Sequence, residues 1–421
     1  MKAIFSSILI LSFVVLSFAQ TAKLNLIRMR YGQQVSFASA QALGLGGAGL
    51  AQQGNLAKAM ENPALVFGKH LGQLTLQAGL MTDKLIEDRQ FPYYDSFVGF
   101  NDFGSYSYNS NYYFSPYVQA RYRLPFEIPM SIQAGFVPFL DFRYNYAEEV
   151  RDPFDKSDKL LGYNRLEQNG LLNQTFVAFS AQVIKNLNLG LKIGILSGSI
   201  DSTMQIQPRV PGNLFPEQRE ERQRELTSTP LLVNLGLHYT VNERLAVGAF
   251  IRLPYTLKFE NKQQTDAQPV KEKLDYPLTL GGGLDYRFQS ILSARVFLDY
   301  LYTFSSKFED SQQPNLHFRD TFTLRGGAEY FIFHNQMPLR LGFSYFTLPY
   351  NYNLANTVIS AGTGWYFGRW QLDLAAGLNH QEFYQPDLFP DTIYGLNART
   401  DLDRVKWTNY YFRFDVTINL F

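Results

Sequence analysis

The chain has 421 residues, with 38 Lys+Arg against 37 Asp+Glu, so its formal net charge is +1. This balance excludes the basic excess that nucleic-acid binding needs, and the absence of cysteine excludes disulfides, thiolate metal sites and a Cys nucleophile. A hydrophobic content of 46%, with 36 Phe and 27 Tyr, excludes disorder, and a mean hydropathy of −0.18 excludes a helical membrane protein.

Residues 1–19 have the pattern of a secretory signal peptide. Lys2 supplies the positive charge, residues 4–15 form an apolar stretch, and Ser17-Phe18-Ala19 is a small-x-small cleavage site. The apolar stretch is too short for a membrane anchor. We expect cleavage after Ala19, so the mature protein leaves the cytoplasm.

Residues 20–71 show no strand-like alternation and contain a glycine-rich stretch over residues 38–51. Glycine permits tight turns and close backbone approach, and Asn62-Pro63 is a turn initiator. The stretch lacks the Lys-Ser/Thr of a P-loop and the spacing of a dinucleotide-binding turn. We therefore predict a periplasmic extension and a compact plug, or hatch, for residues 20–71, ahead of a barrel over residues 72–421.

From about residue 72 to the end, apolar and polar residues alternate. Leu74, Leu76 and Leu80 oppose Thr75 and Gln77, for example, and such alternation gives a strand one apolar and one polar face. We count fourteen such segments, most near or above the roughly 9–11 residues that a tilted membrane strand requires. They are 73–81, 112–124, 131–146, 174–184, 187–205, 231–239, 245–259, 276–288, 293–302, 321–333, 337–346, 356–367, 370–384 and 407–421.

The connections between these segments alternate between long polar loops and short turns, as in outer-membrane barrels. A soluble β-sandwich or lipocalin would also alternate, but the segments are longer than the roughly 5–6 residues of soluble strands, and aromatic residues lie near their ends. We predict an all-β, 14-stranded antiparallel transmembrane β-barrel with an N-terminal hatch in the outer membrane of a Gram-negative bacterium. An even strand count predicts that both termini are periplasmic.

The expected lumen face carries charges of both signs at similar heights. One interpretation is a lattice of ion pairs that rigidifies the lumen; the other is that an arginine binds the carboxylate head of a ligand, because guanidinium matches carboxylate bidentately. Arg295, Arg325 and Arg340 are the candidates for the second role. The five histidines show no pairing with serine on one strand face, and no spacing suggests a metal site. We expect no enzyme activity, no catalytic residue, no metal and no cofactor.

The glycine-rich stretch is Ala38-Ser39-Ala40-Gln41-Ala42-Leu43-Gly44-Leu45-Gly46-Gly47-Ala48-Gly49-Leu50-Ala51, and Glu61-Asn62-Pro63-Ala64-Leu65-Val66 follows it. This arrangement, just ahead of a barrel, resembles the FadL family of outer-membrane transporters. The resemblance implies passive uptake of hydrophobic small molecules, such as long-chain fatty acids or aromatic hydrocarbons, through a barrel plugged by a hatch. It implies hatch or gating roles for Gly44, Gly46, Gly47, Asn62, Pro63 and Ala64, within a gating segment 43–66.

In that family a kinked third strand opens the wall sideways. The third segment here holds Gly135 and Pro138, which become the candidates for such a kink, since proline cannot donate to a strand ladder; a barrel corner is the alternative. FadL-like barrels also serve as accessory subunits of protein secretion, as in the PorV-type proteins, and this is the alternative function. We expect a monomer with a hydrophobic ligand and outer-membrane lipid as partners.

Overall fold

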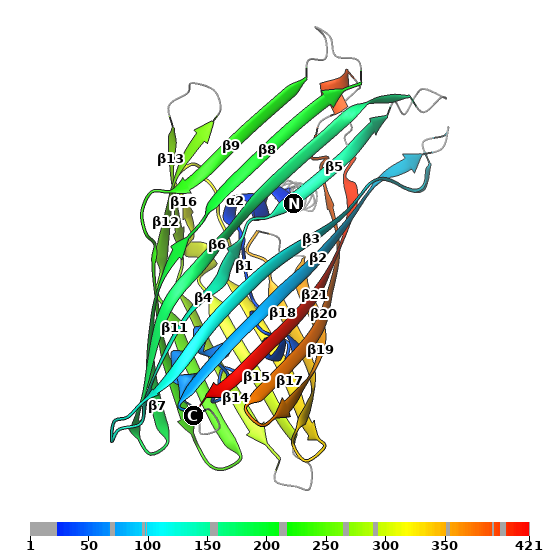
Figure 1. Cartoon of the computed structure of the whole chain (residues 1–421). Helices are drawn as coiled ribbons and strands as arrows, with labels where there is room; N and C mark the ends of the chain where they lie inside the picture. Colours follow the sequence, from blue (N-terminus) through cyan, green and yellow to red (C-terminus); the bar gives the residue numbers. More distant parts are fainter. Residues whose placement is uncertain are drawn as a thin grey trace, which may run out of the picture.

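The computed structural model describes residues 23–67, 72–94, 97, 99–151, 159–209, 217–263, 269–288, 294–350, 354–389, 391–395 and 401–420 (Figure 1). The expected signal peptide, residues 1–19, lies outside the described residues, as do His70 and Phe421. Within the described ranges, no helix is long and apolar enough to cross a membrane.

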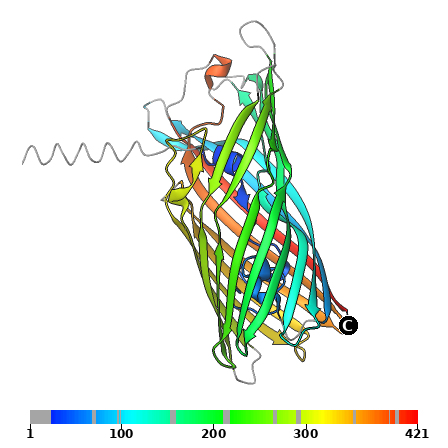
Figure 2. The same cartoon turned by 90° about the vertical axis from the view of Figure 1, so that its left-hand side faces the viewer.

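Fourteen antiparallel strands form a closed barrel, with the last strand paired to the first (Figures 1 and 2). Each of the fourteen predicted segments overlaps one of these strands, which confirms the predicted fold class. The wall strands are β2 (Leu74–Tyr94), β3 (Phe100–Leu124), β4 (Met130–Asp141), β6 (Leu160–Ile184), β7 (Leu187–Ser197), β10 (Leu231–Thr240), β11 (Leu245–Arg252), β14 (Thr279–Arg287), β15 (Ala294–Thr303), β17 (Thr321–Ile332), β18 (Met337–Thr347), β19 (Ala355–Phe367), β20 (Trp370–Gln385) and β21 (Asp403–Leu420).

The alternation in the sequence matches the two faces of the wall. On β7, Leu189, Leu191 and Ile193 face outward and are 39–46% exposed, whereas Asn188 and Lys192 face the lumen and are 1% exposed. An apolar outer face suits contact with lipid, and closure leaves no strand edge over most of the circumference. One end of the barrel carries short turns, which in the described residues lie at 125–129, 185–186, 241–244, 333–336 and 368–369.

Four of the predicted long loops, 82–111, 147–173, 206–230 and 260–275, are wrong in extent because much of each is strand. β2 and β3 continue to residues 94 and 100, so only 95–99 connect them. Beyond the membrane band the outer face of a strand meets water instead of lipid, while the inner face stays buried, as at Ile200, Leu257 and Leu274. The wall pattern of apolar residues outside and polar residues inside therefore no longer holds there. Further strands extend one side of the barrel at this long-loop end (Figure 2): β5 (Tyr144–Arg151), β8 (Ser199–Pro208), β9 (Gln218–Leu226), β12 (Tyr255–Gln263), β13 (Val270–Tyr276) and β16 (Glu309–Asp310).

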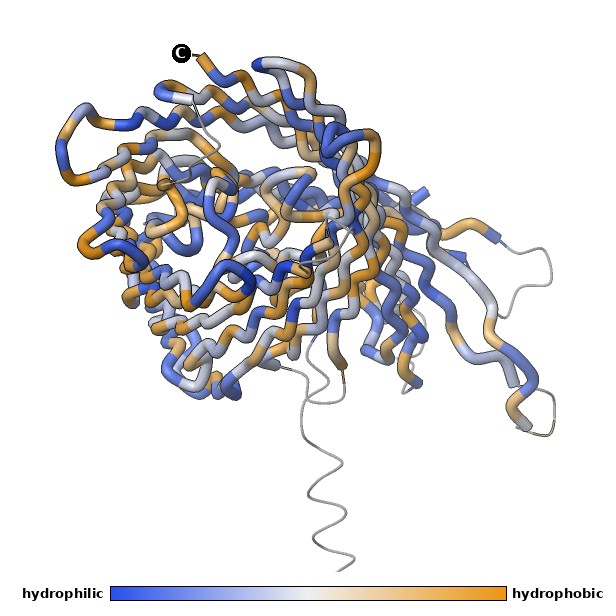
Figure 3. The backbone as a smooth tube through the Cα atoms, turned by 90° about the horizontal axis from the view of Figure 1, so that it is seen from below, coloured by the Kyte–Doolittle hydropathy of each residue, from blue (hydrophilic) through white to orange (hydrophobic). Residues whose placement is uncertain are grey.

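The N-terminal segment, residues 23–67, lies inside the barrel (Figures 1 and 2), and the view along the barrel from below shows chain within the ring of strands (Figure 3). It comprises α2 (Leu24–Tyr31), β1 (Gln33–Gln34), α3 (Ala40–Gly44), η1 (Lys58–Met60) and η2 (Pro63–Val66). Leu43, Leu65 and Val66 are completely buried between this segment and the wall, and each such side chain contributes about 1.5–3 kcal/mol on burial. The main core of the protein is therefore inside the barrel.

Both ends of the chain were expected on the short-turn side. Of the two ends of the described chain, only the C-terminal one lies there. Leu420 of β21 pairs with Leu74 at the short-turn end. Lys23 and Leu24 lie at the long-loop end instead, where the Lys23 Nζ donates to the Leu388 carbonyl at 3.1 Å and the Leu24 N–H donates to Gln385 at 3.0 Å. Strand parity fixes where β2 begins, but it cannot show that the chain ahead of β2 has traversed the lumen.

Candidate functional site

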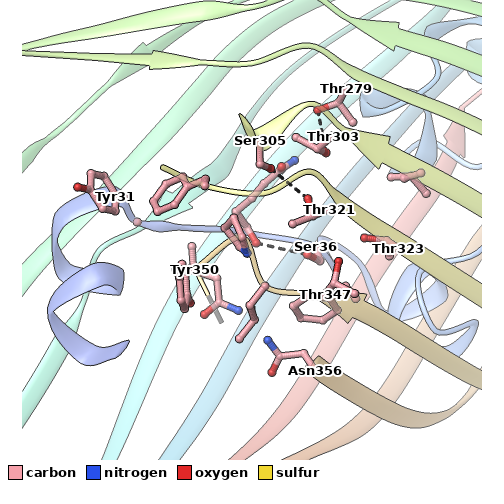
Figure 4. Close-up of a pocket in the computed structure, with 18 of the residues that line it drawn as sticks. Tyr31, Ser36, Thr279, Thr303, Ser305, Thr321, Thr323, Thr347, Tyr350 and Asn356 are labelled. Atoms are coloured by element: carbon pink, nitrogen blue, oxygen red, sulfur yellow. Dashed lines mark hydrogen bonds between the residues drawn. The ribbon is translucent and has the colours of Figure 1, made fainter. Parts of the chain in front are cut away.

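A cavity of about 290 Å³ lies in the lumen, bounded by α2, β1 and Leu140 of β4 on one side and by strands β11 to β21 on the other (Figure 4). Its apolar lining includes Ile27, Leu140, Leu301 and Phe346. Aromatic rings gather at its long-loop side, where Tyr31 packs edge-on against Phe308 with ring centroids 5.1 Å apart. This part of the cavity lining is therefore apolar and aromatic.

A belt of hydroxyl groups forms one wall of this cavity (Figure 4). Thr279, Thr303 and Thr321 are register partners on β14, β15 and β17, so their side chains point inward at one level. The Thr279 and Thr303 hydroxyls are 3.2 Å apart, and the Ser305 and Thr321 hydroxyls are 3.1 Å apart. Each hydroxyl can donate one hydrogen bond and accept two, so the belt retains capacity for a polar ligand.

The helix α2 closes the cavity toward the long loops through ion pairs outside the membrane band. Arg30 donates to Asp310 at 2.7 Å and lies 3.1 Å from Glu272, and the Tyr31 hydroxyl also donates to Asp310 at 3.0 Å. Partial burial raises the pKa of Asp310, but hydrogen bonds from Arg30, Gln312 and Tyr31 outweigh it and hold that pKa below its ordinary value. The carboxylate therefore stays ionised and keeps α2 attached.

The three hatch glycines lie where the hatch touches the wall. An added Cβ on Gly44 would lie 3.1 Å from the Gly362 Cα, and one on Gly46 would lie 2.3 Å from the Phe343 nitrogen. Gly46 and Gly47 also have φ values of +62° and +79°, a left-handed conformation that favours glycine. These residues position the hatch, and their gating role stays a prediction.

The Asn62-Pro63-Ala64 turn ties the hatch to the opposite wall. The Asn62 side-chain amide donates to the carbonyls of Leu50 at 2.8 Å and Leu237 at 3.0 Å, and its Oδ1 accepts from the Ala64 N–H at 3.2 Å. Pro63 lies against Gly190, where an added Cβ would meet backbone at 2.3 Å. The turn is thus a structural anchor, and the gating role of Asn62, Pro63 and Ala64 stays a prediction.

The three candidate head-group arginines already have carboxylate partners. Arg325 pairs with Glu61 of the hatch at 2.8 Å, and Arg340 pairs with Glu329 at 2.8 Å and with Asp373 at 2.6 Å. Arg295 pairs with Asp285 and lies 3.7 Å from Glu329. These contacts form the ion-pair lattice that was the first interpretation. Of the three, only Arg325 lines the cavity.

Gly135 and Pro138 lie where strands β3 and β4 separate. The ladder runs from Leu124↔Met130 to Val118↔Phe136 and continues no further in the described residues. The backbone N–H of Arg123 in β3 donates to the Gln73 carbonyl on the β2 side, so the backbone N–H and C=O groups of even-numbered β3 residues point toward β4. The Pro129 carbonyl accepts from the Gln182 N–H of β6, so the backbone groups of even-numbered residues in this part of β4 point toward β3.

The next hydrogen-bonded rung would therefore join Pro116 to Pro138. Neither proline has an N–H to donate, so this rung cannot form and the ladder ends there. A register shift between Pro138 and Leu140 then turns β4 away from β3. The sequence analysis identified Pro138 but did not pair it with Pro116, because the pairing depends on the register of two strands.

Other groups close the seam between β3 and β4 above this proline rung. From inside, β1 pairs with the free edge of β4, with Gln34 opposite Leu140 and the Val35 N–H donating to Phe139 at 2.9 Å. Arg143 donates to the Phe114 carbonyl and to the Ser115 hydroxyl across the gap, at 2.9 and 2.8 Å. The β1 backbone and the Arg143 side chain thus take the place of the β3–β4 ladder along this seam.

A second, small cavity of about 30 Å³ lies behind β1 and reaches Pro138 and Phe139. Gln34, Glu61 and Arg252 line both this cavity and the larger one. The two cavities are therefore adjacent, and β1 stands between the larger cavity and the proline rung.

Arg252, at the end of β11, is a cavity residue that the sequence analysis missed. It is 5% exposed, and its guanidinium lies over the Phe139 and Phe250 rings. Its inward parity, shared with Ala246 and Phe250 on β11, was visible in the strand pattern. Its distinguishing feature is that no acidic residue occupies its register positions on the neighbouring strands, which are Asn234 and Thr279, and this register is known only from the structure.

Solved structures of outer-membrane channels are similar to this chain. A Pseudomonas aeruginosa FadL homologue aligns with a TM-score of 0.61 at 15% identity, over 92% of this chain and 99% of that one. The P. putida toluene transporter TodX aligns at 0.58 and 14% identity, over 92% and 99%, and the CymD monoaromatic hydrocarbon channel at 0.56 and 16%, over 91% and 97%. At these identities the likeness shows the fold, which is that of FadL-type outer-membrane β-barrels.

No curated protein sequence is significantly similar to the chain. The sequence model of one family, described as BamG, matches residues 121–338, which run from the end of β3 to the start of β18. Because this match spans more than half of the 421 residues, the chain belongs to the BamG family, with a FadL-type barrel as its fold.

Proposed function

We propose that this barrel mediates passive, energy-independent entry of hydrophobic small molecules across the outer membrane, in the size range of aromatic hydrocarbons and fatty acids. The observation that carries the proposal is the proline rung. A transmembrane barrel normally pairs every backbone group with a neighbouring strand, and here Pro116 and Pro138 end one ladder within the wall. Where the ladder is interrupted, fewer strand hydrogen bonds must break for an apolar molecule to leave the lumen through the wall.

The route runs from the long-loop end into the larger cavity, past β1, and out between β3 and β4. The larger cavity is enclosed by α2 on one side and by the hatch on the other. β1 contributes only the two register pairs Gln33↔Asp141 and Gln34↔Leu140, so its release costs few hydrogen bonds, each with a net value of about 1 kcal/mol. β1 is thus the proposed inner gate, in addition to the hatch segment 43–66.

A reversible disulfide between β1 and β4 tests this route. The chain has no cysteine, so a pair introduced by Gln34→Cys and Leu140→Cys has no competing thiols. The rungs on either side are hydrogen-bonded, so Gln34 and Leu140 form a non-hydrogen-bonded pair, with a Cα separation of about 4.5 Å that suits a disulfide. Oxidation should lower the uptake of radiolabelled toluene by expressing bacteria at least roughly tenfold, since the open state is removed from the equilibrium, and a reductant should restore it.

A matched control is the pair Leu341→Cys and Ala361→Cys, register partners on the outer face of β18 and β19. A disulfide there joins two strands that are already paired, so uptake should be equal in both redox states. If the β1–β4 disulfide also left uptake unchanged, the ligand would not leave past β1. If cells with the wild-type barrel took up no more toluene than cells without it, transport itself would be rejected.

A second candidate is an accessory barrel that binds a protein partner. It is favoured by the sheet that β5, β8, β9, β12 and β13 extend beyond the membrane band on one side (Figure 2), since such a wall offers a large polar surface that a small-molecule channel does not require. Gentle purification followed by native mass spectrometry separates the candidates. A bound hydrocarbon or fatty acid supports transport, whereas a stoichiometric protein without lipid supports the accessory role.

A further inference from the structure

The larger cavity has a surplus of positive charge. Three guanidinium groups line it, those of Arg28, Arg252 and Arg325, against the single carboxylate of Glu61. Burying charge of one sign is costly unless a counter-charge is near. The surplus therefore calls for an anion that the described residues do not supply.

Arg252 is the centre of this surplus. Within the described part of the chain its guanidinium makes no ion pair and no hydrogen bond, and its Nε is buried without a partner. Its contacts are the ring faces of Phe139 and Phe250, at 5.5 and 6.0 Å from the ring centroids. Aromatic faces stabilise a cation only modestly and leave the guanidinium N–H groups free to donate.

The acids near these arginines do not remove the surplus, because each of them is shared between two cations. Glu61 pairs with both Arg325 and Lys58, at 2.8 and 3.1 Å. Arg28 lies 3.8 Å from Asp141, which Arg143 binds more closely at 2.9 Å. The Nε atoms of Arg28 and Arg325 are also buried without a hydrogen-bond partner.

The hydroxyl belt lies next to Arg252. Thr279 is the register partner of Arg252, and Thr303 and Thr321 follow at the same level. A guanidinium fork beside a row of hydroxyl donors is the set of groups that phosphate and carboxylate oxygens accept from. The cavity volume of about 290 Å³ is many times the roughly 10–15 Å³ that a single water needs, so the cavity has room for a small organic molecule.

We propose that this cavity is a binding site for a small organic phosphate. Arg252 and the hydroxyl belt bind the phosphate oxygens, and the apolar lining of the cavity surrounds the organic part of the ligand. A doubly charged phosphate monoester matches a surplus of two cations better than a single carboxylate does. The proposal rests on the proposed function only for the path by which the ligand reaches the cavity, because binding itself needs no transport.

Calorimetry on the detergent-solubilised barrel tests the site with four probes. Phenyl phosphate, benzoate and benzyl alcohol share a phenyl body and differ in charge, and inorganic phosphate lacks the body. Affinity should fall in the order phenyl phosphate, benzoate, benzyl alcohol. Weaker binding of inorganic phosphate would show that the apolar lining contributes, whereas equal binding would identify free phosphate as the ligand. Benzyl alcohol binding as tightly as phenyl phosphate would overturn the proposal.

Variants assign the oxyanion contact to Arg252. Arg252→Gln should weaken phenyl phosphate roughly tenfold to hundredfold, the range for a lost charge-assisted hydrogen bond, while benzyl alcohol is unaffected. Arg252→Lys keeps the charge and should keep the preference for phenyl phosphate. Arg219→Gln, on the exposed face of β9, is the matched control and should bind like wild type. Heat-modifiable migration in gels should confirm that each variant barrel is folded. If Arg252→Gln then bound phenyl phosphate as tightly as wild type, the assignment of the phosphate contact to Arg252 would be rejected. If wild type takes up toluene but does not bind phenyl phosphate, the phosphate site is rejected while the proposed transport function stands.

Discussion

At the scale of single residues, close backbone contact decides how the hatch is held. Gly46 lies so near β18 that a Cβ would come within 2.3 Å of the Phe343 nitrogen, and Gly342 faces it at the same contact. Gly46 also has a φ of +62°. Both conditions select glycine at this position, one for space and the other for conformation.

Gly46→Ala should loosen the hatch while the barrel stays folded. A left-handed alanine costs about 1–2 kcal/mol, and the overlap with backbone adds to it because β18 is held on both sides. We expect faster proteolytic cleavage within residues 43–66 and unchanged heat-modifiable migration. Gly368→Ala, in the turn between β19 and β20, is the control, since Gly368 has a φ of +59° but no atom within 4 Å of an added Cβ; it should leave cleavage of the hatch at the wild-type rate. Cleavage no faster in Gly46→Ala than in this control would show that Gly46 does not hold the hatch.

At the scale of elements, the wall differs from a uniform barrel at one ladder. β2 pairs with β3 along nearly its whole length, whereas β3 and β4 share only residues 118–124 and 130–136. The cause is the pair Pro116 and Pro138, together with the register shift that follows Pro138. A lateral seam is thus encoded by two residues that are far apart in the sequence and adjacent in the register.

Pro116→Val combined with Pro138→Val should extend the ladder by one rung. The two restored N–H groups can form two strand hydrogen bonds, each with a net value of about 1 kcal/mol. We expect slow amide exchange at both positions and uptake of toluene reduced severalfold. Pro254→Val, between β11 and β12, is the control and should leave uptake unchanged. Full uptake despite protected amides would show that the seam is not the exit.

At the scale of the whole molecule, the plugged lumen follows from contacts between the hatch and charged wall residues. Asp299 accepts from the N–H groups of Gly49 and Leu50 at 2.8 and 3.1 Å, and Asp415 accepts from the Ala40 N–H at 2.6 Å. These bonds, with the ion pair of Arg325 and Glu61, fix the plug without contributing to the wall ladder.

Replacing residues 43–66 by a Gly/Ser linker of equal length should therefore leave the barrel intact and open it. The wall keeps all its strand pairs, while the lumen exposes Asp299 and Arg325 to water. Single-channel recordings should show a large, persistent ion conductance that wild type lacks. Conductance equal to wild type would show that α2 and β1, and not the hatch, close the channel.

Much of the candidate site was visible in the sequence, because it depended on local pattern. The inward parity of Arg325 and Arg340 and the position of Pro138 on the third strand were all predicted, and the structure places them accordingly. The ion-pair lattice was one of two interpretations, and its partners could not be assigned. Arg252 was missed because what distinguishes it is the absence of an acid on the neighbouring strands, which only the register reveals.

The sequence by itself determined the fourteen wall strands and the order of short turns, because one strand face meets lipid and the other the lumen, and this leaves a period of two in the residues. Only the tertiary structure decided the length of the strands beyond the membrane, where the outer face meets water and the inner face packs in a buried apolar core, so the wall pattern no longer holds. Only the tertiary structure also joined Pro116 to Pro138 and laid β1 on β4, since both depend on closing the barrel around the chain inside it.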